Sequence, residues 1–314
     1  MRARTLVVFV CGLWASGLAA RGDTPAAFGR RGIPAAVGAT LAFHDGLLAV
    51  QERPGRIISL IPAVTEMLFA IDAGPQVVAV SSFDDYPPEV RGLERVGALL
   101  NPDLERILSL KPDLVVAYAT QDDLIARLAR ARVPTFRYEH AGLADVTTTI
   151  RALGGRIGRQ TEAARLAARI EADLNEIRRR VAGRPRPSVL LVFGREARSL
   201  RGIHASGGVG FLHDMLVAAG GANVFADVPR QAVQATSELV LARQPEVILE
   251  IRGGEMSPAQ QRHELDVWRS LPAVPAVRTG RLTMFNDPRT VVPGPRVAEG
   301  TRLIAAVLHP EAFR

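Results

Sequence analysis

Aromatic and acidic side chains stand together in Phe83-Asp84-Asp85-Tyr86, directly after the apolar run Val77–Val80. In an open α/β sheet, the loops at the carboxyl ends of the strands line the ligand crevice. The chain has 2 Trp, 3 Tyr and 11 Phe among 314 residues, so rings gathered at strand ends are informative. They predict residues that line a ligand crevice, although rings that only cap the cores would explain them equally well. Three further aromatic residues end other apolar runs: Tyr118, Tyr138 and Phe193.

Two glutamates, Glu105 and Glu238, occupy matching places in two similar segments of the chain. Each lies seven residues before a proline, Pro112 or Pro245, and an apolar run follows each proline. Both are expected in the first turn of a helix, where a carboxylate is favourable beside the helix dipole. That explanation suffices for each glutamate alone but does not account for their shared register.

A second pair of segments supports an internal duplication, because Glu66–Ala70 resembles Asp214–Ala218. Duplication produces two lobes of one fold, and the cleft between them is the natural ligand site. Two similar sets of strands and helices must therefore position the aromatic and acidic groups.

Catalytic motifs are missing from the sequence. It has no P-loop and no Gly-x-Ser-x-Gly elbow, and Gly207-Gly208-Val209-Gly210 is better explained as a tight turn than as an anion cradle. The six histidines are dispersed, which leaves a zinc site from His140, His204 and a carboxylate as an open alternative. We assign no catalytic residue, no metal ligand and no cofactor, and we expect a protein that is not an enzyme.

The net charge of +7 does not indicate a nucleic-acid partner. Lys111 is the only lysine, and the arginines are scattered, with the densest group near the end of an expected helix at 178–186. A cationic helix end is favourable beside the dipole, and no nucleic-acid reading motif accompanies it. With 47% hydrophobic and 23% charged residues, the composition is that of a globular protein.

The first 20 residues have the layout of a secretory signal peptide. Arg2 and Arg4 precede the apolar stretch Thr5–Leu18, and small residues follow it. The only cysteine, Cys11, lies in this stretch, so the mature chain is expected to have no disulfide. We expect export to the periplasm; whether the mature chain is soluble or anchored through a lipid at Cys11 stays open.

The remaining chain alternates short apolar runs with helical patterns, which predicts α/β lobes with mostly parallel sheets. One stripe breaks the alternation: Leu166, Ile170, Leu174, Ile177 and Val181 predict a single long helix over Thr161–Ala182. We expect it to act as a stiff spine between the lobes. The predicted organisation is a signal peptide (1–20), an arm with a hairpin near 39–50 (21–55), an N-terminal lobe (56–158), a backbone helix (159–183) and a C-terminal lobe (184–314).

Several segments resemble the periplasmic binding proteins for cobalamin and iron complexes, which serve ABC importers. They are RIISLIPAVTE at 56–66, DYPP at 85–88, LERILSLKPDLVV at 104–116, the repeat at 238–245, GGANVFAD at 220–227 and PGPR at 293–296. The resemblance covers about residues 55–314, and within the family the cobalamin receptors are the most similar. It implies two α/β lobes joined by one backbone helix, with the ligand cleft between the lobes.

The resemblance also implies a function. A protein of this family captures a small-molecule ligand and delivers it to an inner-membrane ABC permease dimer. The docking carboxylates of the family, one on each lobe, match Glu105 and Glu238, which explains their shared register. We expect a monomer with no nucleic-acid partner.

The expected ligand is a corrinoid such as cobalamin, although Leu99 and Ala232 stand where the resemblance leads one to expect Trp. A haem receptor is one alternative, with Tyr86, Tyr118, Tyr138 or His140 as axial ligand. A ferric-siderophore receptor, with Arg137, Arg195 and Arg289 as anion contacts, is another. An exported zinc or manganese receptor is the second alternative class. The expected ligand-binding residues are Phe83, Asp84, Tyr86, Tyr118, Phe193, Asp287 and Arg289.

Overall fold

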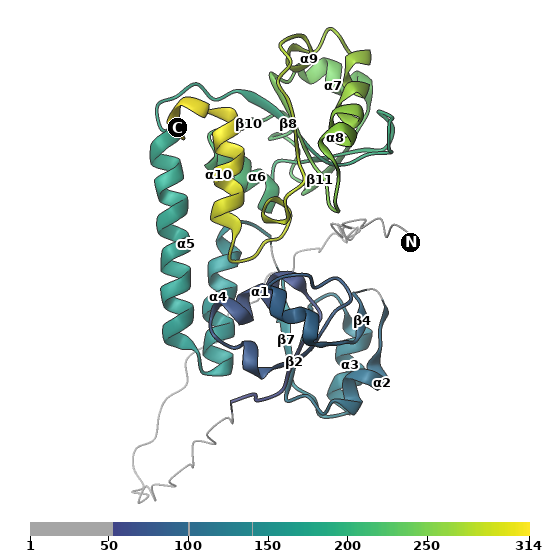
Figure 1. Cartoon of the computed structure of the whole chain (residues 1–314), viewed down its shortest axis with the longest axis vertical. Helices are drawn as coiled ribbons and strands as arrows, with labels where there is room; N and C mark the ends of the chain where they lie inside the picture. Colours follow the sequence, from purple (N-terminus) through teal and green to yellow (C-terminus); the bar gives the residue numbers. More distant parts are fainter. Residues whose placement is uncertain (1–52, 100, 140) are drawn as a thin grey trace, which may run out of the picture. The chain divides into compact units, whose positions relative to one another are not determined.

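A computed structural model describes residues 53–99, 101–139 and 141–314. The predicted signal peptide, the hairpin near 39–50 and nearly all of the predicted arm lie outside the described residues, as do Cys11 and His140. Figure 1 shows the described chain as two groups of strands and helices with a pair of long helices alongside.

The N-terminal sheet is wholly parallel and has the strand order β3-β2-β1-β6-β7. Its strands are β1 (Ile57–Ser59), β2 (Val77–Val80), β3 (Glu94–Arg95), β6 (Leu114–Tyr118) and β7 (Thr135–Tyr138). The helices between them are α1 (Pro62–Ala70), α2 (Leu104–Ser109) and α3 (Asp122–Arg130), with short 3-10 turns η1 (Gly74–Gln76) and η2 (Pro88–Gly92). A small antiparallel ladder joins β4 (Gly97–Ala98) to β5 (Asn101–Pro102).

The C-terminal sheet has the order β11-β9-β8-β12-β13, with β10 also paired to β8. Its core pairs, β8 with β12 and β12 with β13, are parallel, whereas β9 runs antiparallel to both of its neighbours, β8 and β11. The strands are β8 (Ser188–Gly194), β9 (Ile203–Ser206), β10 (Ala222–Asn223), β11 (Ala232–Ala235), β12 (Val247–Ile251) and β13 (Leu282–Phe285). The helices are α6 (Phe211–Ala218), α7 (Ser237–Arg243), α8 (Pro258–Leu265), α9 (Pro275–Arg278) and α10 (Val297–Leu308), with η3 (Asp266–Ser270), η4 (Pro288–Thr290) and η5 (Pro310–Ala312). The predicted α/β fold with two mostly parallel sheets is confirmed.

Two antiparallel neighbours in sequence, α4 (Ala144–Ile157) and α5 (Gln160–Val181), pack along each other, and α10 packs on α5 and α6. Helix α5 differs by one residue at each end from the expected span Thr161–Ala182. All five residues of its predicted apolar stripe are buried. Its 22 residues reach about 33 Å, long enough to contact both sets of strands. The division into lobes at 56–158 and 184–314, and a cleft between them, stay predictions.

The core is continuous from the N-terminal sheet to one face of the C-terminal sheet. In β8, Val189 and Leu191 join the core that contains β1, β6, α5 and α10, whereas Leu190 and Val192 belong to a second core. Because side chains alternate across a strand, β8 and β12 divide their residues between the two cores. The long helices therefore join both sheets through buried apolar surface.

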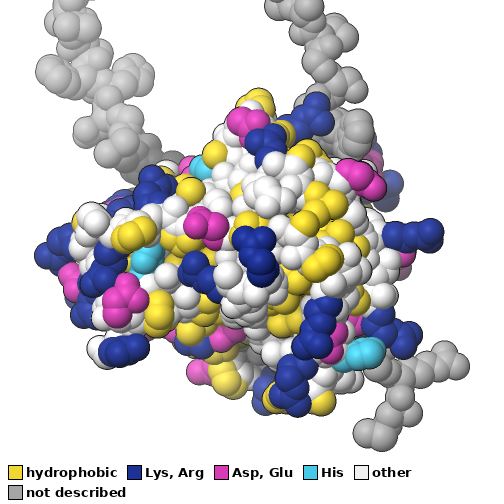
Figure 2. Space-filling model, turned by 90° about the horizontal axis from the view of Figure 1, so that it is seen from above, with side chains coloured by type: hydrophobic (Ala, Val, Ile, Leu, Met, Phe, Trp, Pro, Cys, Tyr) yellow, Lys and Arg dark blue, Asp and Glu magenta, His cyan; other side chains and the backbone are white. Residues whose placement is uncertain are grey.

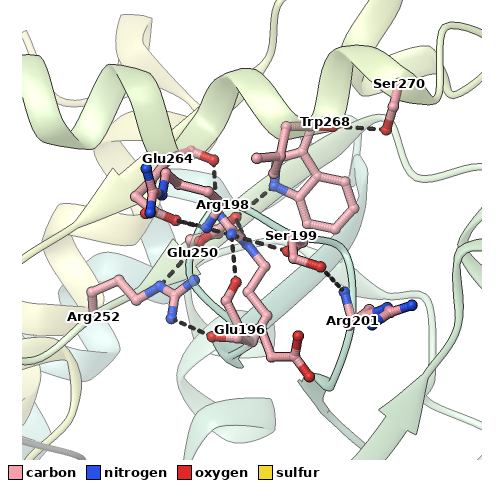
Figure 3. Close-up of polar contacts among 11 residues, drawn as sticks. Glu196, Arg198, Ser199, Arg201, Glu250, Arg252, Glu264, Trp268 and Ser270 are labelled. Atoms are coloured by element: carbon pink, nitrogen blue, oxygen red, sulfur yellow. Dashed lines mark hydrogen bonds and ion pairs between the residues drawn. The ribbon is translucent and has the colours of Figure 1, made fainter.

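The second core contains a buried set of charges around Glu250 (Figure 3). Glu250 of β12 and Arg195 have side chains with no exposed surface, and Arg195 Nε donates to Glu250 Oε1 at 2.9 Å. Trp268 Nε1 donates to the same oxygen at 2.5 Å, and Arg252 Nε donates to Oε2 at 3.2 Å. Glu264 Oε2 accepts from Arg195 Nη1 at 3.0 Å. Two arginines and two glutamates thus offset one another where the cost of an unpaired charge is greatest.

Some sequence-based expectations about local structure are wrong. The dipeptide Asn101-Pro102 predicts a helix over Asn101–Leu110 with Asn101 as its N-cap, but α2 begins at Leu104 with Asp103 as its N-cap. Asn101 and Pro102 pair instead with Ala98 and Gly97, so this stretch is held as a strand. The residue pattern after Pro62 predicts a helix over Thr65–Ala73, but α1 begins at Pro62 and ends at Ala70, three residues earlier at each end.

The surface seen in Figure 2 carries arginines with acidic side chains between them, and they do not merge into one basic face in that view. Within the described part of the chain, no helix has the length and apolarity to cross a membrane.

We predict that Glu250→Ala lowers the free energy of unfolding by about 3–5 kcal/mol, because it leaves two buried guanidinium groups without their shared carboxylate. Unfolding in guanidinium chloride measures the change. It is followed by the fluorescence of Trp268 in a chain without residues 1–20, because those residues contain the other tryptophan, Trp14. The control is Glu255→Ala, which removes an exposed carboxylate shortly after β12 and is expected to change stability by less than about 0.5 kcal/mol. Equal effects of the two substitutions would contradict the prediction.

Candidate functional site

The loop after β2 presents two aromatic rings because buried polar groups hold its backbone. Asp84 is fully buried, and its Oδ2 accepts from the backbone N–H of Ser81 at 2.9 Å and from the Ser81 hydroxyl at 2.5 Å. Arg95 Nη1 donates to the carbonyl oxygens of Ser81 and Asp84 at 2.8 and 2.7 Å. Phe83 and Tyr86 are each 44% exposed on the outside of this loop.

Asp84 was predicted to touch the ligand, and its burial corrects that expectation. A side chain with no exposed surface cannot present an oxygen to an incoming molecule, so Asp84 shapes the loop that carries Phe83 and Tyr86. Burial raises the pKa of Asp84 to about 6, although hydrogen bonds from Ser81 and the charge of Arg95 act in the opposite direction.

Tyr86 is held from behind by an arginine that is 210 residues away in the sequence. The guanidinium carbon of Arg296 lies 3.7 Å from the centroid of the Tyr86 ring. The same guanidinium makes two hydrogen bonds to Glu66 of α1, Nε to Oε2 at 2.9 Å and Nη2 to Oε1 at 2.6 Å. Burial raises the pKa of Glu66, and the bonds from Arg296 only partly offset this effect.

Asp287 and Arg289, both predicted ligand contacts, form an ion pair next to this group. Arg289 Nη2 donates to Asp287 Oδ2 at 2.6 Å, and Arg289 Nη1 donates to Glu299 Oε2 at 3.2 Å. The bonds from Arg289 lower the pKa of Asp287, and the charge of Arg296 lowers it further. The structure therefore places Arg296 against Tyr86, and the charge of Arg296 also acts on Asp287.

The other predicted aromatic residues make ring contacts within their own sheets. Tyr118, at the end of β6, lies with its ring centroid 5.4 Å from that of Tyr138 in β7. Phe193 of β8 stacks on His204 of β9 with centroids 6.2 Å apart. Tyr118 and Phe193 are partly exposed, whereas Tyr138 is buried. Their contact with a ligand stays a prediction.

The structure bears on two alternative ligands, the anionic ferric complex and the metal ion. Arg195 is enclosed by Glu250 and Glu264 and has no exposed side-chain surface, so it is unsuited to bind an anionic ligand. Arg137 is exposed. Within the described residues, no group of three or more His, Cys, Asp or Glu side chains is placed to hold a metal ion.

Arg296 and Glu66 were not predicted as site residues. Both lie in segments that support the family resemblance, but their pairing joins positions 230 apart, and no local pattern reveals such a contact. The one feature of the sequence that could have pointed to them is a glutamate and an arginine placed among apolar residues, because a buried charge seldom lacks a partner.

Glu105 and Glu238 keep their matching register in the structure. Each is exposed and is the second residue of its helix, after an N-cap, Asp103 or Thr236, whose side chain accepts from the backbone N–H three residues on. Each helix leads into a central strand of its sheet, β6 or β12. The Thr236 side chain lowers the pKa of Glu238, which keeps that carboxylate ionised.

Comparison with known proteins agrees with this architecture. A family model described as periplasmic binding protein matches residues 57–285. A vitamin B12-binding protein of Pectobacterium carotovorum is 32% identical over 244 residues, which cover 76% of this chain and 85% of that protein. The solved periplasmic vitamin B12-binding protein of Vibrio cholerae has a TM-score of 0.70 at 26% identity and covers 83% of this chain and 99% of its own. The periplasmic heme-binding protein from Roseiflexus sp. has a TM-score of 0.69 at 27% identity, covering 82% and 98%.

The chain belongs to the periplasmic binding protein family. It is a substrate-binding component of an ABC importer, so its partners are a permease and a small-molecule ligand. The expectation that it is not an enzyme is confirmed, because the family binds its ligands without converting them.

We predict that Asp84 makes the protein less stable as pH rises from about 4 to about 6. The pKa of about 6 in the folded protein lies above the ordinary aspartate value of 3.8. The folded state therefore holds the proton more tightly than the unfolded state, and this stabilisation is lost as pH rises through 6. Asp84→Asn abolishes the titration. Its unfolding free energy relative to the wild type should therefore increase by up to about 3 kcal/mol between pH 4 and pH 7.

The matched control is Asp85→Asn, which removes the exposed carboxylate next in the chain. Urea unfolding of the three proteins at pH 4.5, 6 and 7.5 gives the differences directly. A constant difference between Asp84→Asn and the wild type at all three pH values would contradict the buried, raised pKa.

Proposed function

We propose that the protein captures a corrinoid in the periplasm and delivers it to an inner-membrane ABC permease. The observation that carries this proposal is the exposed ring pair after β2. Of the four large hydrophobic side chains that are exposed in the described part of the chain, two are Phe83 and Tyr86. A corrin ring offers a broad apolar face to such side chains. The likeness to vitamin B12-binding proteins at 32% identity supports the same ligand.

The proposed site combines Phe83, Tyr86 and Tyr118 from the first sheet with Phe193, Asp287 and Arg289 from the second. The proposed location is the cleft between the two lobes, at the carboxyl ends of the parallel strands. Arg289 and Arg296 are each paired with a carboxylate and so offer no unpaired positive charge, which suits a ligand whose polar groups are mostly uncharged amides.

Haem is the second candidate ligand, because the Roseiflexus heme-binding protein is as similar in fold as the vitamin B12-binding structure. Tyr86 is 44% exposed and Tyr118 is partly exposed, and each carries a phenol of the kind that serves as an axial ligand to haem iron. A ferric complex would instead depend on Arg137 and Arg289.

We predict that cyanocobalamin stabilises the mature protein. At about 100 times its dissociation constant it adds about 2.7 kcal/mol, which raises the melting temperature by about 5–10 °C for a chain of this size. Thermal unfolding with cyanocobalamin, haemin, a ferric hydroxamate and zinc in parallel identifies the ligand. A shift with haemin and none with cyanocobalamin would replace the corrinoid with haem, and a shift with zinc alone would reject both.

We further propose that Glu105 and Glu238 dock the protein onto the permease, one on each lobe. Both are exposed at the start of helices that occupy equivalent places in the two sheets. A permease built of two similar halves can meet both carboxylates with equivalent cationic groups. Docking on such a permease would explain why Glu105 and Glu238 occupy matching positions in the two similar segments.

We predict that Glu105→Ala combined with Glu238→Ala reduces ligand uptake at least tenfold and leaves ligand affinity within about twofold. The double substitution removes charge from the docking surface but from no residue of the proposed binding site. Uptake in cells and affinity of the purified protein are measured in parallel. Glu89→Ala with Glu255→Ala, which removes one exposed carboxylate from each lobe, is the control. Lost affinity with normal uptake would overturn the docking role.

A further inference from the structure

Arg296 contacts two separate parts of the chain. Its guanidinium pairs with Glu66 of α1 and stacks on Tyr86 in the loop after β2. The Arg296 side chain is only 18% exposed and that of Glu66 only 3%. The guanidinium plane is therefore fixed by a carboxylate at its edge and by a ring at its face.

The chain around Arg296 is built for close approach. Gly294 is buried, and a Cβ at this position would lie 3.3 Å from Glu66 Oε2 and 3.6 Å from the carbonyl oxygen of Ala63. Val297 begins α10 directly after Arg296, and α10 packs on α5 and α6. The arginine is thus anchored at its backbone by the long helices and at its tip by α1.

The stacking leaves one side of Tyr86 available. A guanidinium 3.7 Å from the ring centroid covers one face of the ring. The residue is nevertheless 44% exposed, so much of its remaining surface is open to solvent. A ring supported on one face and open elsewhere is a fixed platform for a flat ligand face.

We propose that Arg296 is a positioning residue of the ligand site: paired with Glu66, it holds the Tyr86 ring as a platform for the planar face of a macrocyclic ligand. This inference rests on the proposed function for its ligand class. In this proposal the Glu66–Arg296 pair affects binding through Tyr86, and neither residue of the pair contacts the ligand. Lysine cannot replace this arginine, because an ammonium lacks the planar fork that meets both oxygens of Glu66 and the flat face that stacks on the ring.

The test is a double-mutant cycle with Arg296→Lys and Tyr86→Leu. Arg296→Lys keeps the positive charge beside Glu66, and Tyr86→Leu keeps apolar volume without the ring. Affinity for cyanocobalamin, or for haemin where haemin is the probe that binds, is measured for the wild type, both single variants and the double variant. We expect Arg296→Lys to weaken binding about tenfold in the wild type and less than twofold in the Tyr86→Leu background. Equal losses in both backgrounds would overturn the positioning role.

Two further variants separate this role from a general loss of packing. Glu66→Gln removes the charge of the partner while keeping one acceptor oxygen, and should weaken binding only when Tyr86 is present. Arg302→Lys, on the same helix α10, is the matched control and should leave affinity unchanged. A loss of affinity in Arg302→Lys as large as that in Arg296→Lys would also contradict the proposal.

A measurement without ligand keeps this inference distinct from the proposed function. The near-ultraviolet circular dichroism of tyrosine reports whether the Tyr86 ring is held in one orientation. We expect Arg296→Lys to reduce the tyrosine signal by about as much as Tyr86→Leu does, and Arg302→Lys to leave it unchanged. If no probe binds the wild type, the corrinoid and haem proposals fail while this result still decides the role of Arg296. An unchanged tyrosine signal in Arg296→Lys would overturn it.

Discussion

The structure depends on one shared apolar core. The N-terminal sheet, the helices α4, α5 and α10 and one face of the C-terminal sheet bury their side chains together. Any large rotation of one sheet against the other would expose part of this surface, and apolar surface costs about 25 cal/mol for each Å² returned to water. The core therefore favours a binding protein in which the site is largely formed before the ligand arrives, with small movements of loops and side chains.

The close packing of α4 against α5 requires a small residue at the contact, and this requirement is hard to recognise in a sequence pattern. Gly154, near the end of α4, has no room for a side chain, because a Cβ there would lie 2.3 Å from the Cβ of Ala163 in α5. Glycine in a helix interior lowers helix propensity, and the run Thr147-Thr148-Thr149 lowers it further. The glycine and the threonines make α4 difficult to predict from the sequence, although Gly154 is what allows α4 and α5 to lie against each other.

The predictable parts of the fold are those with local causes. Helix α5 follows from its stripe, and the bounds of α7, α10, β2 and β12 agree with apolar patterns and flanking prolines. The start of α2 was misplaced because β5 pairs with β4, and the antiparallel strands β9 and β11 were missed because their pairing defines them more than their composition. The same limit applies to the site. The exposed ring of Tyr86 follows from its place after an apolar run, whereas the burial of Asp84 and the support from Arg296 depend on contacts that only the folded chain creates.

The buried charges have a common location and, we infer, a common purpose. Glu66, on the helix after β1, pairs with Arg296, and Glu250, near the end of β12, pairs with Arg195, which directly follows β8. Arg95, at the end of β3, donates to the backbone carbonyl oxygen of Asp84. A buried ion pair adds little stability over a well-packed apolar pair, because removing two charges from water consumes most of the attraction. What an ion pair adds is direction, since a bidentate guanidinium–carboxylate contact fixes the plane of the arginine. Charges retained at the strand ends, and absent from the middle of the shared core, are therefore best understood as devices that orient the loops and rings of the binding site.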